Sequence, residues 1–380
     1  MFIFERLISL GFFFLAILIA CYLMSRIKGK QYRVILALYL LVLTGFAWCY
    51  EPYITADLYR LRQYVEAWIN LSFEGAFDYA CHTTTPSWIL FSYFTNQIGN
   101  QNWMQSIACL WCYGNIFIVL SKVIDRFDLK KTDRGWLLFY IMSVGTLFLQ
   151  AISGIRTMLG FSIVFLCVYR EYFEGKSAIW DLPFYIIAGL FHPAVLVLLG
   201  LRFIGLALEG KSGINRILNI LFSVMVVAIG LYYAYDYLLA ANDKAVDYMT
   251  NDAEYTYMWE YLIGCIESVQ ILFLCYWWKK GTPSLCDGEN WSIRSYVVMN
   301  ALFTLGCICF IPLSYSIFRR FTVFATMLSL PILGAFLQRC AIERTRGVLW
   351  ARWAINLMSV IIMFLSIARG DLCGYKFFLS

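Results

Sequence analysis

Apolar runs of membrane-spanning length follow one another along most of the chain, and they decide what it can fold into. A helix needs about 20 apolar residues to cross the hydrocarbon core of a bilayer. Runs close to this length cover residues 5–24, 34–50, 103–121, 135–152, 157–172, 216–235, 261–278, 295–314, 321–338 and 353–369. Only 14% of the 380 residues are charged, against about a quarter in a typical soluble domain. The sequence therefore predicts an all-α, polytopic membrane protein.

The positively charged residues gather in short loops between these runs, which predicts an orientation. The basic loops are 25–33, 122–134 and 339–352, with a fourth that begins at Lys279. Because Lys and Arg are enriched in loops on the cytoplasmic side, we assign all four to the cytoplasm. Segments 51–102 and 236–258 then become periplasmic loops. The net charge is +6, but since the basic residues cluster in these short loops, we expect no nucleic-acid partner.

The chain between residues 178 and 208 must leave the cytoplasmic side and return to it under this assignment. Its one interruption is His192-Pro193. Proline cannot continue a helix interior, and the residue before it is pushed away from helical angles. We therefore predict two short helices, 178–191 and 194–208, that meet at His192; a single kinked span is the alternative. This gives about twelve transmembrane helices in one integral membrane domain, 1–380, with the apolar piece 86–98 interfacial or re-entrant.

The predicted topology brings charged and titratable residues from separate parts of the chain to the outer face. These residues are Arg156, His192, Arg319, Arg320, Asp57, Arg60, Arg62 and His82, with Arg319 and Arg320 in a short outer turn. Ionisable groups at membrane depth are costly and usually functional. An arginine guanidinium matches phosphate oxygens bidentately. The sequence therefore predicts an anion site in an outer-face cavity, suited to a lipid-linked pyrophosphate.

Several of these residues also have simpler interpretations. Outer arginines can extend to lipid headgroups, and His192 can be a general base, a donor to phosphate, or a buried structural group. Asp57 can act as a base, orient a sugar hydroxyl, or pair with Arg60 or Arg62, because an i to i+3 spacing suits an ion pair on a helix. His82 lies in a polar loop and is expected to be solvated.

The sequence carries no metal-ligand pattern. The 13 cysteines are scattered, many of them inside apolar stretches, and none has the paired spacing of a zinc site. There is no HExxH and no aspartate-rich motif. We therefore predict no metal and no cofactor.

Two motifs resemble the EpsG/Wzy group of bacterial polysaccharide polymerases. The first is Gly154-Ile155-Arg156-Thr157-Met158 at the start of a span, and the second is Ala188-Gly-Leu-Phe-His192-Pro-Ala194. The early Asp57-Leu58-Tyr59 and the late Arg320-Phe321 are also similar to that group. Pro193 departs from the pattern, where a polar or small residue is expected.

The resemblance implies a GT-C-like glycosyltransferase of the bacterial inner membrane with a periplasmic active face. Such an enzyme moves a growing glycan from one undecaprenyl-pyrophosphate carrier to a second lipid-linked repeat unit, with inversion and without a metal. It implies donor and acceptor lipid-linked oligosaccharides, membrane lipid and a possible chain-length regulator as partners. The alternatives are a flippase for lipid-linked oligosaccharides, which calls for repeated halves with matching broken helices, and a membrane O-acyltransferase that uses His192.

Overall fold

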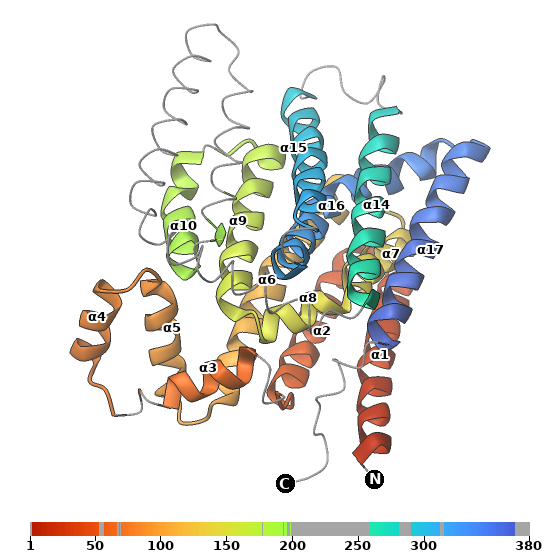
Figure 1. Ribbon diagram of the computed structural model, residues 1–380. Coiled ribbons are helices and arrows are strands. Elements are labelled where there is room, and N and C mark those ends of the chain that lie inside the picture. The colour runs from red at the N-terminus through yellow and green to blue at the C-terminus, as the bar shows by residue number, and fades with distance from the viewer. Residues whose placement is uncertain are drawn as a thin grey trace, which may run out of the picture.

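The computed structural model of the protein describes residues 2–52, 57–66, 68, 70–176, 178–192, 194–195, 198, 258–280, 290–311 and 315–368. The predicted span 216–235, most of the predicted helix 194–208 and nearly all of the predicted loop 236–258 lie outside these residues. Every regular element in the described part of the chain is a helix. Figure 1 shows most of the long helices side by side in a bundle, with α3, α4 and α5 gathered at one end of it.

The helices have the following bounds: α1 Phe2–Arg26, η1 Gly29–Gln31, α2 Tyr32–Trp48, α3 Asp57–Glu66, α4 Phe73–Cys81, α5 Pro86–Asn96, α6 Asn102–Arg126, α7 Lys131–Ser143, α8 Gly145–Ile152, α9 Ile155–Glu174, α10 Ala178–Phe191, α14 Met258–Lys280, α15 Asn290–Cys309, α16 Tyr315–Ile342 and α17 Arg346–Ala368. Helix α10 coincides with the predicted helix 178–191 and ends before His192. Helix α5 occupies most of the segment predicted to be interfacial or re-entrant.

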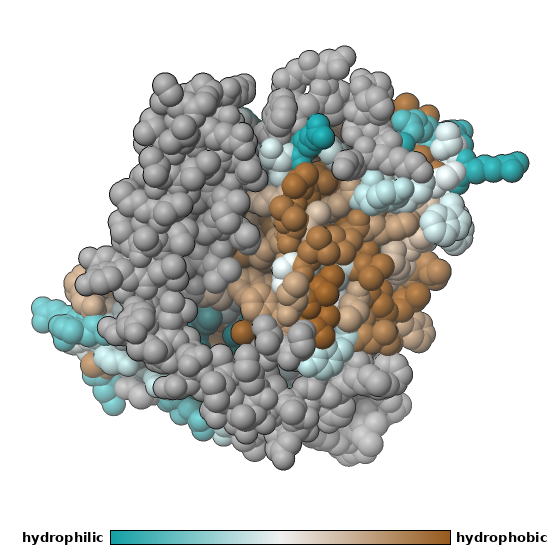
Figure 2. All heavy atoms as spheres, turned by 45° about the horizontal axis from the view of Figure 1, so that its top comes forward, coloured by the Kyte–Doolittle hydropathy of each residue, from teal (hydrophilic) through white to brown (hydrophobic). Residues whose placement is uncertain are grey.

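Five helical stretches in the described part of the chain are long and apolar enough to cross a membrane, judged by length and composition. They are Gly29–Trp48, Asn102–Arg126, Tyr261–Trp278, Ile317–Ile342 and Arg346–Ser366. Large hydrophobic side chains are exposed along α1, α2, α14, α15 and α17, and Figure 2 shows an apolar face of this kind with hydrophilic residues near its margins. The protein is therefore a multi-pass membrane protein. The count of about twelve spans and the GT-C-like fold stay predictions.

The basic loops 25–33, 122–134 and 339–352 and the end of α14 lie at one end of the bundle, which we call the basic end. Arg33 pairs with Asp125, Arg134 donates to the Gly29 carbonyl at 3.0 Å, Arg352 donates to Asp133 at 2.6 Å, and Arg339 donates to the Trp277 carbonyl at 2.8 Å. These contacts tie the 122–134 loop to the loop after α1 and to α17, and tie the end of α16 to the end of α14. The opposite end carries α3 and the starts of α9 and α16, and we call it the site end.

One of the predicted spans is wrong, because it consists of two helices. Residues 135–152 were expected to form a single helix, but α7 stops at Ser143 and α8 begins at Gly145, with Val144 at a non-helical φ of −78° and ψ of 78°. Helix α8 has eight residues, so it is about 12 Å long and lies across the bundle in Figure 1. It buries Leu147, Phe148 and Ile152 among other helices. Its apolar sequence therefore reflects contact with protein, which hydropathy cannot tell from contact with lipid.

Helices α9 and α10 approach each other closely at Gly160. A Cβ atom there would lie 2.4 Å from Val195 Cγ2 and 2.9 Å from the backbone oxygen of Ala188. Val195 follows the break at His192, so this contact holds the chain on both sides of the break against α9. Gly160 is four residues after Arg156, so the two share one face of α9.

We expect Gly160→Ala to lower the thermal stability of the purified protein in detergent. The added methyl meets a backbone carbonyl that cannot rotate away, and overpacking of this kind costs about 1–3 kcal/mol. Gly45→Ala on α2 is the matched control, because nothing lies within 4 Å of its Cβ position. Equal melting temperatures for the two variants would contradict the close packing.

Candidate active site

Arg156 occupies the first turn of α9, directly after a tight entry into the helix. Gly154 caps the helix, and a Cβ atom on it would lie 2.4 Å from Gln150 Oε1. The Arg156 guanidinium stands over the Trp88 ring of α5, 5.9 Å from the ring centroid. An arginine over an indole face is a favourable cation–π arrangement. Trp88 was absent from the sequence-based site, and it fixes where the Arg156 head group lies.

Helix α3 docks on the entry to α9 through a hydrogen bond. The backbone N–H of Leu58 donates to Ser153 Oγ at 3.2 Å. Leu58, Leu61 and Val65 are buried on the inner side of α3. The first residue of α3, Asp57, is therefore held beside the turn that leads into Arg156.

Asp57 lies between two arginines. Arg60 Nη2 donates to Asp57 Oδ1 at 2.8 Å, and Arg320 Nη2 lies 3.6 Å from Asp57 Oδ2. The predicted pair of Asp57 with Arg60 is confirmed. The Arg320 contact joins the start of α16 to the start of α3, which are more than 250 positions apart in the chain.

Arg319 and Arg320 do not lie in a turn, as the sequence suggested, but in the first turns of α16. Their side chains leave a helix about 100° apart and therefore have different surroundings. Arg319 is 3% exposed and forms a two-point ion pair with Glu267 of α14, which is fully buried; the Nη2 to Oε1 distance is 3.0 Å. A buried charge needs such a partner. The pair holds α16 against α14 at the residue directly before Arg320. Glu267 was missed, although a lone acidic residue inside an apolar run is a signal visible in sequence.

Arg62 is a structural anchor in this geometry. Its side chain is 12% exposed, and Nη2 donates to Asn102 Oδ1 at 2.7 Å, to Gln105 Oε1 at 2.8 Å and to the Tyr50 carbonyl at 3.2 Å. Burial lowers the pKa of the guanidinium, and the nearby Glu51 carboxylate partly offsets that effect. These contacts fix α3 to the end of α2 and the start of α6, so Arg62 supports the site from behind.

His82 lies apart from this group at the end of α4. Its side chain is 76% exposed, and its Nδ1 lies 2.8 Å from the carbonyl oxygen of Asp78, one turn earlier in the same helix. This fits the expectation of a solvated residue.

His192 follows the last residue of α10 and is partly buried. Its Nδ1 accepts a hydrogen bond from the backbone N–H of Ala194 at 3.1 Å. A neutral imidazole carries one proton, so this contact places the proton on Nε2. Phe191 packs on Phe91 of α5 with ring centroids 6.2 Å apart, and α5 also carries Trp88. The same short helix thus contacts both the Arg156 and the His192 segments.

The structure therefore brings Arg156, His192, Asp57, Arg60 and Arg320 to the site end, buries Arg319 and Arg62 in supporting contacts, and leaves His82 exposed. Among the described residues, no three His, Cys, Asp or Glu side chains form a group that could hold a metal ion.

The EpsG family model matches residues 49–377, which is most of the chain. The chain belongs to the EpsG family. No curated protein and no solved structure matches it. Membership in the EpsG family indicates a membrane protein of the polysaccharide-polymerase kind, as the Arg156 and His192 motifs predicted.

We expect Glu267→Gln to destabilise this EpsG-family protein strongly, because it leaves the Arg319 charge buried without its carboxylate. Breaking a buried ion pair from one side costs about 3–5 kcal/mol. The double variant Glu267→Leu, Arg319→Met should recover most of the loss. Thermal melting in detergent measures both, with Glu74→Gln on the exposed face of α4 as the control. A double variant no more stable than Glu267→Gln would count against a structural role for the pair.

Proposed function

We propose that this EpsG-family protein is a polysaccharide polymerase of the bacterial inner membrane, with the site end facing the periplasm. It transfers a growing glycan from undecaprenyl pyrophosphate to the terminal sugar of a second lipid-linked repeat unit. The observation that carries the proposal is the convergence of Arg156, Arg320 and Asp57 at one end of a membrane bundle. The donor and acceptor lipids are its partners, and a chain-length regulator can bind beside it.

In this proposal Arg156 and Arg320 hold the donor pyrophosphate. Each guanidinium presents a planar fork of donors to phosphate oxygens. The cation–π contact with Trp88 restricts the position of the Arg156 head group, so that less conformational entropy is lost on binding. The 3.6 Å contact between Arg320 and Asp57 is longer than a strong hydrogen bond, which allows Arg320 to turn toward a phosphate.

Residues of this chain alone supply the groups that the chemical step needs. The acceptor hydroxyl oxygen attacks the anomeric carbon of the donor sugar, and the bond from that carbon to the pyrophosphate oxygen breaks with inversion. The hydroxyl proton passes to the Asp57 carboxylate, and the arginines stabilise the negative charge on the departing pyrophosphate. No metal is needed in this scheme, because the guanidinium groups supply the positive charge.

His192 serves this scheme as a hydrogen-bond donor and not as a base. A base must have a free lone pair at the atom that faces the proton. Since Nδ1 accepts from Ala194, Nε2 bears the proton and donates, either to a pyrophosphate oxygen or to a sugar oxygen. Arg60 holds Asp57, whereas Arg319 and Arg62 position the helices that carry the site.

We expect Arg156→Ala and Arg320→Ala each to reduce glycan chain extension roughly ten- to a hundredfold, because one charge-assisted phosphate contact is worth about 1.5–3 kcal/mol. Arg156→Lys should restore only part of the activity, since an ammonium cannot bind bidentately. The measurement is the ladder of glycan bands from a polymerase-null strain that carries the gene and its repeat-unit cluster. Arg344→Ala, exposed at the basic end, is the control at equal protein level. Unchanged ladders in both site variants would remove the anion site from the mechanism.

We expect His192→Gln to keep more activity than His192→Ala. The glutamine amide places an N–H donor near the position of imidazole Nε2 and cannot act as a base at neutral pH. Initial rates with purified protein, taken over a pH range around the usual histidine pKa of about 6.5, test this. Equal inactivity of the two variants, with a wild-type rate that rises as the imidazole loses its proton, would show that His192 is the base.

A further inference from the structure

The carboxylate of Asp57, the base in the proposed reaction, lies between two arginines that contact it differently. Arg60 belongs to the same helix and donates from Nη2 to Asp57 Oδ1 at 2.8 Å. Arg320 comes from α16, and its Nη2 lies 3.6 Å from Oδ2, which is longer than a normal hydrogen bond. The contact on Oδ2 is therefore the weaker of the two, and it is the one that another anion can most easily replace.

The backbone on both sides of the contact between Arg320 and Asp57 is anchored. Helix α3 is held next to Asp57 by the hydrogen bond from the Leu58 N–H to Ser153 Oγ. Helix α16 is held next to Arg320 by its buried ion pair with Glu267 of α14. Because the two helices are fixed by separate contacts, the contact breaks when the Arg320 side chain turns.

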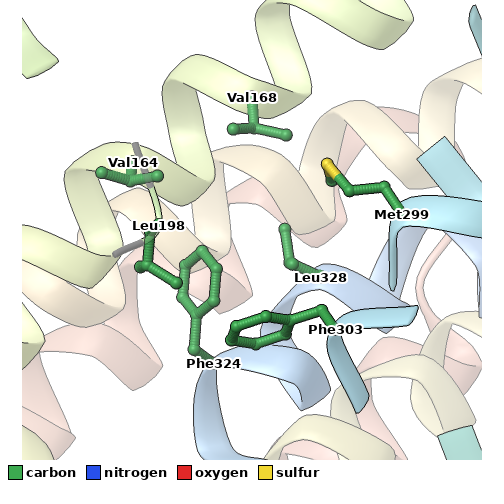
Figure 3. Close-up of a pocket in the computed structure, with 7 residues that line it drawn as sticks. All are labelled: Val164, Val168, Leu198, Met299, Phe303, Phe324 and Leu328. Carbon is green, nitrogen blue, oxygen red and sulfur yellow. The ribbon is translucent and has the colours of Figure 1, made fainter. Parts of the chain in front are cut away.

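Turning into the bundle would place the Arg320 guanidinium among apolar side chains. Phe324 follows Arg320 by four residues, so the two share one face of α16. Seven apolar side chains line a small gap on this side of the helix, among them Val164, Phe303, Phe324 and Leu328 (Figure 3). A guanidinium there would lose its hydration without gaining a partner. Arg320 can therefore turn only at the site end.

The starts of α9 and α16 lie next to each other at the site end. Phe161 of α9 contacts Phe321 and Phe324 of α16, with ring centroids 5.8 and 5.0 Å apart. Arg156 lies five residues before Phe161, and Arg320 directly precedes Phe321. A pyrophosphate held by Arg156 therefore lies on the side to which Arg320 can turn.

We propose that the donor pyrophosphate draws Arg320 away from Asp57 when it binds, so that an acceptor is activated only after the donor is in place. The inference rests on the proposed function and adds the order of its steps. A phosphate binds a guanidinium through two parallel hydrogen bonds, whereas Asp57 has one long contact with Arg320. Since partly exposed ion pairs contribute little, the pyrophosphate displaces Asp57 from Arg320.

The exchange changes what the two oxygens of Asp57 face. Before the donor binds, Arg320 occupies the approach to Oδ2. After the exchange, Oδ2 faces the hydroxyl of the acceptor sugar, while Arg60 keeps its contact with Oδ1 and holds the carboxylate in place. Arg60 is therefore a positioning residue, and Arg320 couples the binding of the donor to the availability of the base.

Equilibrium binding of inorganic pyrophosphate to the purified protein in lipid nanodiscs tests this competition without turnover. Asp57→Asn should tighten binding roughly two- to fivefold more in the wild-type background than in an Arg320→Gln background, about the effect of one exposed ion pair. The difference arises because the competition requires Arg320, whereas simple repulsion between Asp57 and the anion does not. An equal gain in both backgrounds, or no gain in either, would overturn the proposal.

The matched control is Asp78→Asn, which removes one negative charge from a side chain that is 80% exposed on α4. It should leave the affinity for pyrophosphate unchanged in both backgrounds. Asp57→Ser is a second variant that keeps a capping side chain at the start of α3. A wild-type protein that binds no pyrophosphate would refute the anion site of the proposed function. Normal binding without coupling between Asp57 and Arg320 would refute only the order of steps.

Arg60 provides a separate test during turnover. Arg60→Gln should lower kcat for glycan transfer and leave the affinity for inorganic pyrophosphate unchanged, because Arg60 contacts Asp57. Arg60→Lys should restore most of kcat, since an ammonium can replace a one-point contact, whereas Arg320→Lys should not restore a two-point contact with phosphate. Equal losses of kcat in Arg60→Gln and Arg60→Lys, or weaker pyrophosphate binding by Arg60→Gln, would contradict the positioning role.

Discussion

The close contact between α9 and the chain on both sides of His192 is the feature on which the site depends. Only a glycine at position 160 leaves room for Val195 and the Ala188 carbonyl. Because Arg156 lies one turn before this contact and His192 lies within it, the distance between the two helices sets the distance between the two functional segments. Trp88 and Phe91 of α5 then cover both segments from the same side.

Two adjacent arginines show how a helix divides charge between structure and function. Arg319 turns into the bundle and is held by Glu267, whereas Arg320 turns toward Asp57. The buried pair costs desolvation that its own attraction must offset, and it fixes the rotation of α16 about its axis. That rotation turns Arg320 toward Asp57.

The sequence predicted the parts that follow from local patterns. The lengths of the apolar runs predicted a membrane protein and most of its helices. Pro193 predicted the end of α10, and the i to i+3 spacing predicted the pair of Asp57 and Arg60. Prediction from the sequence failed where one pattern can arise from two different physical causes. The apolar residues 145–152 are buried by helices and not by lipid, and Arg319 has the same local sequence context as Arg320 but the opposite surroundings. Trp88, Ser153 and Glu267 joined the site through contacts across 50 to 95 positions, which no local pattern contains.

The contacts at the basic end have a mechanical consequence. The ion pairs and carbonyl contacts of Arg33, Arg134, Arg339 and Arg352 fasten α2, α7, α16 and α17 to their neighbours there. The site end is held by other contacts, chiefly the buried Arg319–Glu267 pair and the hydrogen bonds of Arg62. The two ends of the bundle are therefore fastened independently, so a substitution at the basic end can change the stability of the fold without altering the contacts of Arg156 and Arg320.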